Sequence, residues 1–222
     1  MSTKAHLAPD LHPASRLPLI DPIVLTARAE AFDDPAWLFE PKYDGLRGMI
    51  YNAPASCEIR SRRDFRFDRF GDLCDRIAGV LGSREAIFDG EIVALNRQGK
   101  PVFRDLVRGA GYVAFAAFDL LWLDGTDLRG LPLTERKQAL GDLLPRDTGP
   151  LYKTLTMEED GRALFSAAKK MDLQGVVAKR KNDQYSPATS WYNIRNPGYS
   201  QYEERVEVPR SRERRRAERA GG

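Results

Sequence analysis

The octet Glu40-Pro41-Lys42-Tyr43-Asp44-Gly45-Leu46-Arg47 sets a lysine beside a turn-forming dipeptide and close to an arginine, in otherwise apolar, strand-forming sequence. A lysine ammonium is not a nucleophile, so a protein that uses one must lower its pKa and hold it rigidly against the electrophile. Arg47 can supply a fixed positive charge and a bidentate grip on phosphate. The octet therefore suggests a covalent lysine site. Taken by itself, it leaves one alternative open, a hairpin in which Lys42 is merely solvated.

The pattern of apolar residues predicts strands with helices between them. Residues 46–51 alternate, so Arg47, Met49 and Tyr51 should share one face of a strand. Further strands are predicted at 86–95, 113–122, 175–180 and 191–196. Helices are predicted between 70 and 80 and from 134 to 144. Thr156 and Glu159 are expected to form a capping box that opens a third helix, which runs toward Met171. This mixture indicates an α+β fold with antiparallel sheets and a cleft between the layers.

Five further short motifs follow the octet along the chain. They are Ile59-Arg60-Ser61-Arg62, Phe88-Asp89-Gly90-Glu91, Ala117-Phe118-Asp119-Leu120-Leu121, Gln174-Gly175-Val176-Val177-Ala178-Lys179 and Trp191-Tyr192-Asn193-Ile194-Arg195. In this order the six motifs resemble the signatures of the covalent nucleotidyltransferases, the superfamily of ATP-dependent DNA ligases, RNA ligases and mRNA capping enzymes. The chain is most similar in organisation to a stand-alone adenylation domain of the bacterial ligases related to end-joining.

The resemblance implies an α+β fold in which two antiparallel β-sheets with flanking helices form a nucleotide cleft, an ATP-grasp-like arrangement. Residues 19–200 are expected to form this adenylation (nucleotidyltransferase) domain. A disordered leader is expected at 1–18 and a charged, arginine-rich tail at 201–222. Only 25 residues follow Pro197, too few for the five-stranded oligonucleotide-binding barrel of larger family members, so no barrel is expected.

The resemblance also implies roles for individual residues. Lys42 is expected to attack ATP and carry AMP covalently. Nucleotide contacts are implied for Glu40 at the adenine end, Arg47 and Arg62 near the ribose and phosphates, Glu91 at the ribose, Phe118 on the adenine ring, Lys179 at the α-phosphate and Arg195 in the last motif. From the residues alone, Glu40 could instead be a strand-edge charge in water and Phe118 a core residue. Asp89 is expected to shape a turn, and Asp119 to hydrogen-bond structural backbone.

The last two motifs depart from the family pattern. Gln174 stands where the family usually has a glutamate, and a neutral ligand holds a divalent cation less well, although Glu91 and Gln174 remain the expected metal ligands. Asn193 and Arg195 stand where the family usually has two lysines. Since Gln174 removes a negative charge and Asn193 a positive one, the net charge of the site is kept. The protein is expected to be active, with a rate that these changes could reduce; a degenerate relative that binds nucleotide without chemistry is the alternative.

Composition limits the partners. The net charge is +3, of which seven arginines and five glutamates after Tyr202 contribute +2, so a nucleic-acid footprint must be a local patch or the tail. Cys57 and Cys74 lack metal-ligand spacing and are interpreted as reduced structural thiols. No apolar run is long enough to cross a bilayer and the first residues lack a signal peptide, so no membrane partner is expected. The expected location is the bacterial cytosol or nucleoid.

The expected function is that of an ATP-dependent DNA ligase-like adenylyltransferase, which passes AMP from Lys42 to a 5′-phosphate during nick sealing in DNA repair or recombination. ATP and Mg²⁺ (or Mn²⁺) are the expected cofactors. Nicked double-stranded DNA is the expected partner, together with a separate DNA-binding or end-joining protein. A catalytically weak nucleotide-binding module in a repair complex is one alternative, and an RNA ligase or capping-type enzyme is another.

Overall fold

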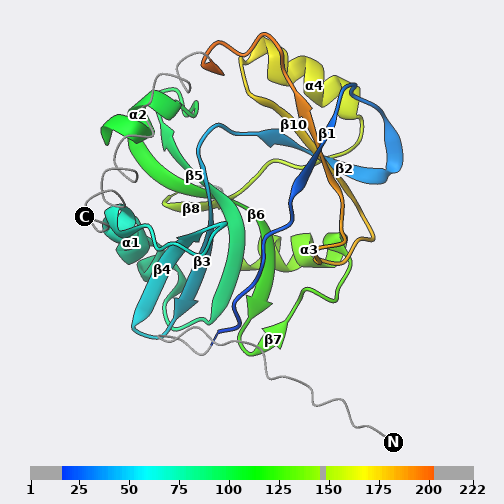
Figure 1. The fold of residues 1–222 in the computed structure, drawn as a ribbon. Helices are drawn as coiled ribbons and strands as arrows, with labels where there is room; N and C mark the ends of the chain where they lie inside the picture. Colours follow the sequence, from blue (N-terminus) through cyan, green and yellow to red (C-terminus); the bar gives the residue numbers. More distant parts are fainter. Residues whose placement is uncertain (1–16, 146–148, 203–222) are drawn as a thin grey trace, which may run out of the picture.

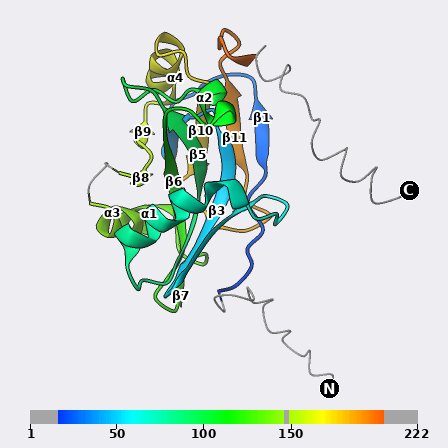
Figure 2. The ribbon, with the colours of Figure 1, turned by 90° about the vertical axis from the view of Figure 1, so that its left-hand side faces the viewer.

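Two β-sheets face each other, and helices flank them (Figures 1 and 2). The computed structural model describes residues 17–145 and 149–202. The first sheet has the strand order β1-β11-β10-β2-β9 and the second the order β4-β3-β5-β6-β7, with β8 also paired to β6. The pairings are antiparallel except for β1 with β11 and β6 with β8. The predicted α+β fold with two sheets is confirmed.

The elements have the following bounds. The first sheet contains β1 (Leu25–Arg28), β2 (Asp34–Lys42), β9 (Met157–Glu159), β10 (Gly175–Arg180) and β11 (Trp191–Arg195). The second contains β3 (Leu46–Ala53), β4 (Ser56–Ser61), β5 (Ala86–Leu95), β6 (Tyr112–Leu123), β7 (Thr126–Asp127) and β8 (Leu151–Lys153). The helices are the short 3₁₀ turn η1 (Asp68–Phe70), α1 (Gly71–Leu81), α2 (Phe103–Arg108), α3 (Leu133–Leu143) and α4 (Gly161–Lys170). None of the helices described here is long and apolar enough to cross a membrane.

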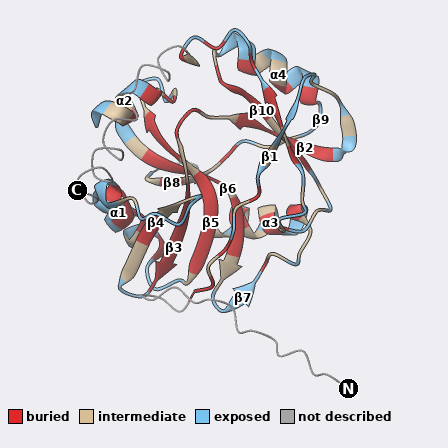
Figure 3. Ribbon diagram, viewed as in Figure 1, coloured by how far each residue is buried: buried red, intermediate tan, exposed pale blue. Residues whose placement is uncertain are grey.

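The two faces of the second sheet are buried against different neighbours. Along β3, Met49 and Tyr51 join a core cluster that also contains Trp191 of the first sheet. Ile50 points the other way, into the cluster beneath α1 and α3. The predicted alternation along this strand is therefore correct. Figure 3 shows β5 and β6 buried along most of their length, which fits strands covered on both faces.

The octet crosses from one sheet to the other. Lys42 ends β2 and pairs with Gly175 in the first sheet, whereas Leu46 begins β3 and pairs with Ile92 in the second. The turn between them is tight, because a Cβ atom on Gly45 would lie 2.1 Å from the carbonyl oxygen of Ile92. Only glycine fits there, so the Asp44-Gly45 pair places Lys42 at the seam between the sheets.

The predicted capping box is wrong. Residues 157–159 form the edge strand β9, and α4 begins only at Gly161, without a side-chain cap from Asp160. A distant residue supplies the cap instead, since Asp33 Oδ1 accepts the backbone N–H of Arg162 at 2.8 Å. Local sequence cannot reveal a cap that comes from another part of the chain.

The predicted turn at Asp89-Gly90 is also wrong, because β5 runs through both residues, although its register with β6 shifts between them. Gly90 is needed for close packing: a Cβ atom there would lie 2.1 Å from the Phe115 ring and 2.6 Å from the carbonyl oxygen of Ala116. Glycine inside a strand often marks such close contact.

The ends of the folded body differ from the predicted boundaries by two residues. Leu17 is buried, with 1% of its surface exposed, so residues 17 and 18 of the predicted leader belong to the core. Gln201, assigned to the tail, accepts the backbone N–H of Phe103 at 3.1 Å. The rest of the predicted leader (1–16) and of the predicted tail (203–222) lies outside the described residues.

Gly90→Ala should lower the free energy of unfolding by about 1–3 kcal/mol, because the added methyl group overpacks the contact with Phe115. Gly79→Ala is the matched control, since Gly79 lies in α1, where an added Cβ atom would have nothing within 4 Å of it. This control should raise the free energy of unfolding by about 0.8–1 kcal/mol through helix propensity. Urea unfolding of both variants measures the difference; equal effects of the same sign would contradict the packing argument.

Candidate functional site

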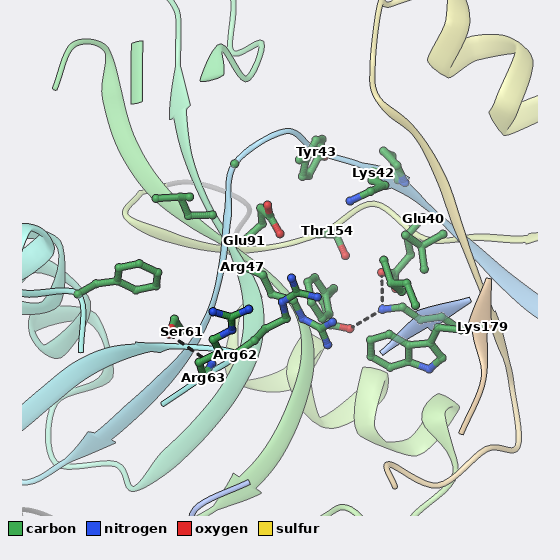
Figure 4. Close-up of a pocket in the computed structure, with 18 of the residues that line it drawn as sticks. Glu40, Lys42, Tyr43, Arg47, Ser61, Arg62, Arg63, Glu91, Thr154 and Lys179 are labelled. Atoms are coloured by element: carbon green, nitrogen blue, oxygen red, sulfur yellow. Dashed lines mark hydrogen bonds and ion pairs between the residues drawn. The ribbon is translucent and has the colours of Figure 1, made fainter. Parts of the chain in front are cut away.

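A cavity of about 460 Å³ opens between the two sheets, within the size range of ligand sites (Figure 4). Most of the predicted site residues line it, namely Glu40, Lys42, Arg47, Arg62, Glu91, Phe118 and Lys179. They come from five different strands and from the loop after β4, and Lys42 and Glu91 extend into the cavity from opposite sides (Figure 4). The sequence motifs therefore converge on one concave site.

Glu40 is a buried carboxylate held between two lysines. Its Oε2 lies 2.7 Å from the Nζ of Lys179, and its Oε1 is ion-paired with Lys137 of α3. Burial alone would raise the pKa of Glu40, but the two lysines lower it below its usual range. Only 2% of the residue is exposed, so the alternative of a strand-edge charge in water is wrong. The carboxylate is thus fixed as an ionised hydrogen-bond acceptor on the cavity wall.

Lys179 is a buried ammonium that rests on aromatic rings. Its Nζ lies 4.4 Å from the ring centroid of Phe118 and 4.0 Å from that of Trp191, within the range of cation–π attraction. Burial lowers the pKa of Lys179 to about 8, although the neighbouring Glu40 raises it. A group with this pKa changes charge just above neutral pH.

Arg47 is held by Asp89 rather than left open for phosphate. Its Nε and Nη2 bond the two carboxylate oxygens of Asp89 at 3.1 and 2.7 Å, and its Nη1 donates to the Ile23 carbonyl at 2.6 Å. Tyr185 donates its hydroxyl to the same carboxylate at 2.6 Å. Burial would lower the pKa of Arg47, but Asp89 raises it overall. The bidentate fork that the sequence suggested for phosphate is therefore already occupied, and Asp89 forms an ion pair instead of shaping a turn.

The other cavity residues differ in exposure. Phe118 is half-buried and meets Trp191 edge-on at 5.8 Å, so it both packs on the core and lines the cavity. Glu91 is half-buried on β5, directly across the ladder from Arg47. Arg62 and Arg63 are exposed in the loop that follows β4. The cavity thus combines an aromatic wall, the buried pair of Glu40 and Lys179, the half-buried Glu91 and exposed arginines.

Two of the predicted residues do not line the cavity. Arg195 is exposed at the end of β11. Gln174 is buried, and its Nε2 donates to Asp44 at 3.2 Å. Asn193, which departs from the family pattern, is also buried, and its Oδ1 has no hydrogen-bond partner among the described residues. Of the three residues that differ from the family pattern, Gln174 and Asn193 are thus buried polar side chains, and Arg195 lies on the surface.

The family model of the ATP dependent DNA ligase domain matches residues 24–195, the part of the chain that builds both sheets and the cavity. The chain belongs to this family.

Relatives of this ligase-domain family agree on the fold. The multifunctional non-homologous end joining protein LigD of Pseudomonas aeruginosa is 35% identical over 169 residues, which cover 72% of this chain and 20% of LigD. The solved ligase domain of Mycobacterium tuberculosis LigD superposes with a TM-score of 0.68 at 30% identity, covering 77% of this chain and 57% of that one. A mycobacterial DNA ligase D complexed with ATP and MES gives a TM-score of 0.70 at 28% identity, covering 79% and 60%. The matched region spans about a fifth of the length of the multifunctional LigD proteins of Pseudomonas aeruginosa and Mycolicibacterium smegmatis.

Sequence reasoning missed several residues that hold the motif residues in place. Lys137 contacts Glu40 from a helix 97 positions further along the chain, and nothing in its local sequence marks it. Tyr185 holds Asp89 from a loop outside all six motifs. Asp119 accepts the N–H of Leu120, as expected, but it also forms a fully buried ion pair with Arg136. Each missed residue is a partner of a motif residue, and the burial of a motif charge is the signal that could have predicted such partners.

Asp89→Asn should lower the free energy of unfolding by about 3–5 kcal/mol, because it leaves the guanidinium of Arg47 largely buried without its counterion. Asp64→Asn is the matched control, since the Asp64 side chain is 56% exposed where it pairs with Arg60. Asn tolerates the positive φ of residue 64, and loss of an exposed pair changes stability by about 1 kcal/mol or less. Urea unfolding of both variants gives the comparison; a small effect at Asp89 would refute the role given to the buried pair.

Proposed function

We propose that this chain is an ATP-dependent adenylyltransferase of the DNA ligase type, with Lys42 as the nucleophile. The neutral Nζ of Lys42 attacks the α-phosphorus of ATP, the bond to the β-phosphate oxygen breaks, and pyrophosphate leaves. The resulting phosphoramidate carries AMP, which passes to the 5′-phosphate at a DNA nick before the 3′-hydroxyl displaces AMP. The observation that carries this proposal is that Lys42 shares one cavity with Glu40, Glu91, Phe118 and Lys179.

The cavity offers a complementary partner for each part of ATP. The ionised Glu40 can accept a hydrogen bond from the exocyclic amino group of adenine, whereas the carbonyl of guanine would meet another acceptor. The rings of Phe118 and Trp191 provide an aromatic face for the base, and Glu91 can accept from ribose hydroxyls. Lys179 supplies positive charge for the phosphates, so developing charge on pyrophosphate would be stabilised by groups already in position.

A divalent cation fits this site only with help from the substrate. No group of three or more His, Cys, Asp or Glu residues in 17–145 and 149–202 could hold a metal by itself. Mg²⁺, however, is often bound by one or two carboxylates together with the phosphates of the substrate. Glu91 would then hold the ion against bound ATP, where it would neutralise phosphate charge. Gln174 is committed to Asp44 and lies off the cavity, so its predicted metal role has no support.

Exposed cations near the cavity mouth favour a nucleic-acid substrate. Arg62 and Arg63 form no ion pair with any residue of the described part of the chain, although Arg60 and Arg66 on either side do. Phe65 is 68% exposed in the same loop. Unpaired arginines beside an exposed aromatic ring suit a phosphate backbone and an unstacked base. We therefore infer that nicked DNA docks on this loop. The involvement of a separate DNA-binding or end-joining protein stays a prediction.

Incubation with ATP and Mg²⁺ should add one adenylyl group to the intact protein by mass spectrometry, and the adduct should be acid-labile, as a phosphoramidate is. Lys42→Ala should abolish the adduct, and Lys42→Arg, which keeps the positive charge, should abolish it equally because guanidinium is not nucleophilic at neutral pH. Replacing ATP by GTP should give little adduct, and nicked DNA should discharge it faster than nicked RNA. ATP binding without any adduct would instead support the nucleotide-binding module, the alternative that the buried Asn193 and the exposed Arg195 favour.

ATP affinity should fall as the pH rises above 8. The pKa of Lys179 is lowered to about 8 in the unliganded protein, so its ammonium is present below this pH and is lost above it. ATP favours the charged form, and the Kd measured with Lys42→Ala, which cannot react, should therefore rise by up to about tenfold per pH unit above 8. Lys179→Arg on the same background keeps its charge and should give a flat profile. Equal slopes for lysine and arginine at this position would rule out titration of Lys179 as the cause.

A further inference from the structure

The turn that carries Lys42 is fixed from two opposite sides. On one side, Gly45 abuts the backbone of Ile92, as its lack of space for a Cβ atom shows. On the other side, the carboxylate of Asp44 accepts the Nε2 of Gln174 at 3.2 Å and the hydroxyl of Tyr199 at 2.9 Å. Asp44 is buried, with 3% exposed, so these hydrogen bonds are shielded from water.

Tyr199 is itself held in place by the segment 196–202. Its neighbour Ser200 bonds the carboxylate of Asp172 through its backbone N–H at 2.9 Å and its hydroxyl at 2.7 Å. Tyr202 donates its hydroxyl to the carbonyl of Gln174 at 3.2 Å, and its ring meets that of Tyr199 edge-on at 5.1 Å. The hydroxyl that reaches Asp44 is therefore anchored on the loop before β10, and β10 pairs with β2 beside Lys42.

Residue 174 is uncharged, and this matters for its hydrogen bond to Asp44. A carboxylate at this position would lie about 3 Å from that of Asp44 in a buried environment, and repulsion would strongly disfavour the ionisation of both groups. An amide instead donates a hydrogen bond to Asp44 and adds no second negative charge. Asp44, Gln174 and Tyr199 do not line the cavity, so none of them can act by touching ATP.

We propose that Tyr199 and Gln174 are positioning residues for Lys42: together they hold Asp44, and through it the turn that aims the nucleophile. On this view Gln174 is not a weakened metal ligand but the neutral residue that the Asp44 site requires. The proposal rests on the proposed function, because it concerns the geometry of the same lysine. Misplacement of a nucleophile by about 1 Å can reduce a rate by up to about a hundredfold, so loss of this support should be measurable.

The first test is Tyr199→Phe, which removes one hydroxyl and keeps the ring. The rate of adduct formation should fall by about tenfold or more, whereas the Kd for ATP should stay unchanged because the cavity lining is intact. Tyr192→Phe is the matched control: it removes a hydroxyl on the other face of the first sheet, where the ring stacks on Trp37. The control should keep the wild-type rate. A wild-type rate for Tyr199→Phe would overturn the proposal.

The second test is Gln174→Glu, which should make the reaction pH-dependent. At low pH the two carboxylates share a proton and the rate should approach that of the wild type at the same pH. As the pH rises and both groups would ionise, the turn is displaced and the ratio of variant to wild-type rate should fall. A constant ratio across pH would contradict the charge argument.

Hydrogen exchange separates this proposal from the proposed function. Backbone amides of 43–46 should exchange faster in Tyr199→Phe and in Gln174→Glu at high pH, but not in Tyr192→Phe, with the rest of the sheets unchanged. If the wild-type protein forms no adduct, the adenylyltransferase proposal fails, yet the exchange rates still decide whether Tyr199 and Gln174 hold the turn. If the exchange rates of the backbone amides of 43–46 were unchanged in both variants, the positioning role would be refuted even in an active enzyme.

Discussion

The passage of the chain from one sheet to the other within three residues is the constraint on which the rest of the site depends. Lys42 is the last residue of β2 and Leu46 the first of β3, so the amine is attached to the seam itself. No side chain can be added at Gly45 without meeting the Ile92 backbone, and this leaves the connection little room to move. Under the proposed function, this turn gives a nucleophile on a long flexible side chain a rigid point of attachment.

Several buried charges near this seam are matched by a counterion. Glu40 lies with Lys137 and Lys179, Arg47 with Asp89, and Arg136 with Asp119. Such pairs are weak sources of stability because desolvation offsets their attraction, but breaking one leaves a costly isolated charge. The pairs also link elements that no sheet ladder joins: α3 contacts β2 through Lys137 and β6 through Arg136. The electrostatic partners therefore fix the cavity walls relative to one another.

The sequence predicted the elements whose pattern is local, and the motif residues themselves. The alternation along β3, the strands at 86–95 and 175–180 and the helix before Gly82 all follow from periodicity. The failures share one physical cause, a partner distant in the chain. Asp33 caps α4, Asp89 needs Arg47 and Tyr185, and Gln174 is explained only by Asp44. Motif order placed Lys42, Glu91 and Phe118 around one cavity, but no spacing rule could tell that Arg195 would lie on the surface.

The position of Lys179 has a consequence for how a nucleotide enters. Its ammonium lies over the rings of Phe118 and Trp191, the two rings assigned to the purine under the proposed function. A base that stacked where this cation lies would displace the ammonium from the rings and from Glu40. A nucleoside would leave the displaced ammonium of Lys179 without a counterion, whereas the phosphates of a triphosphate would supply one. Binding of the base would then itself favour ligands that carry phosphate.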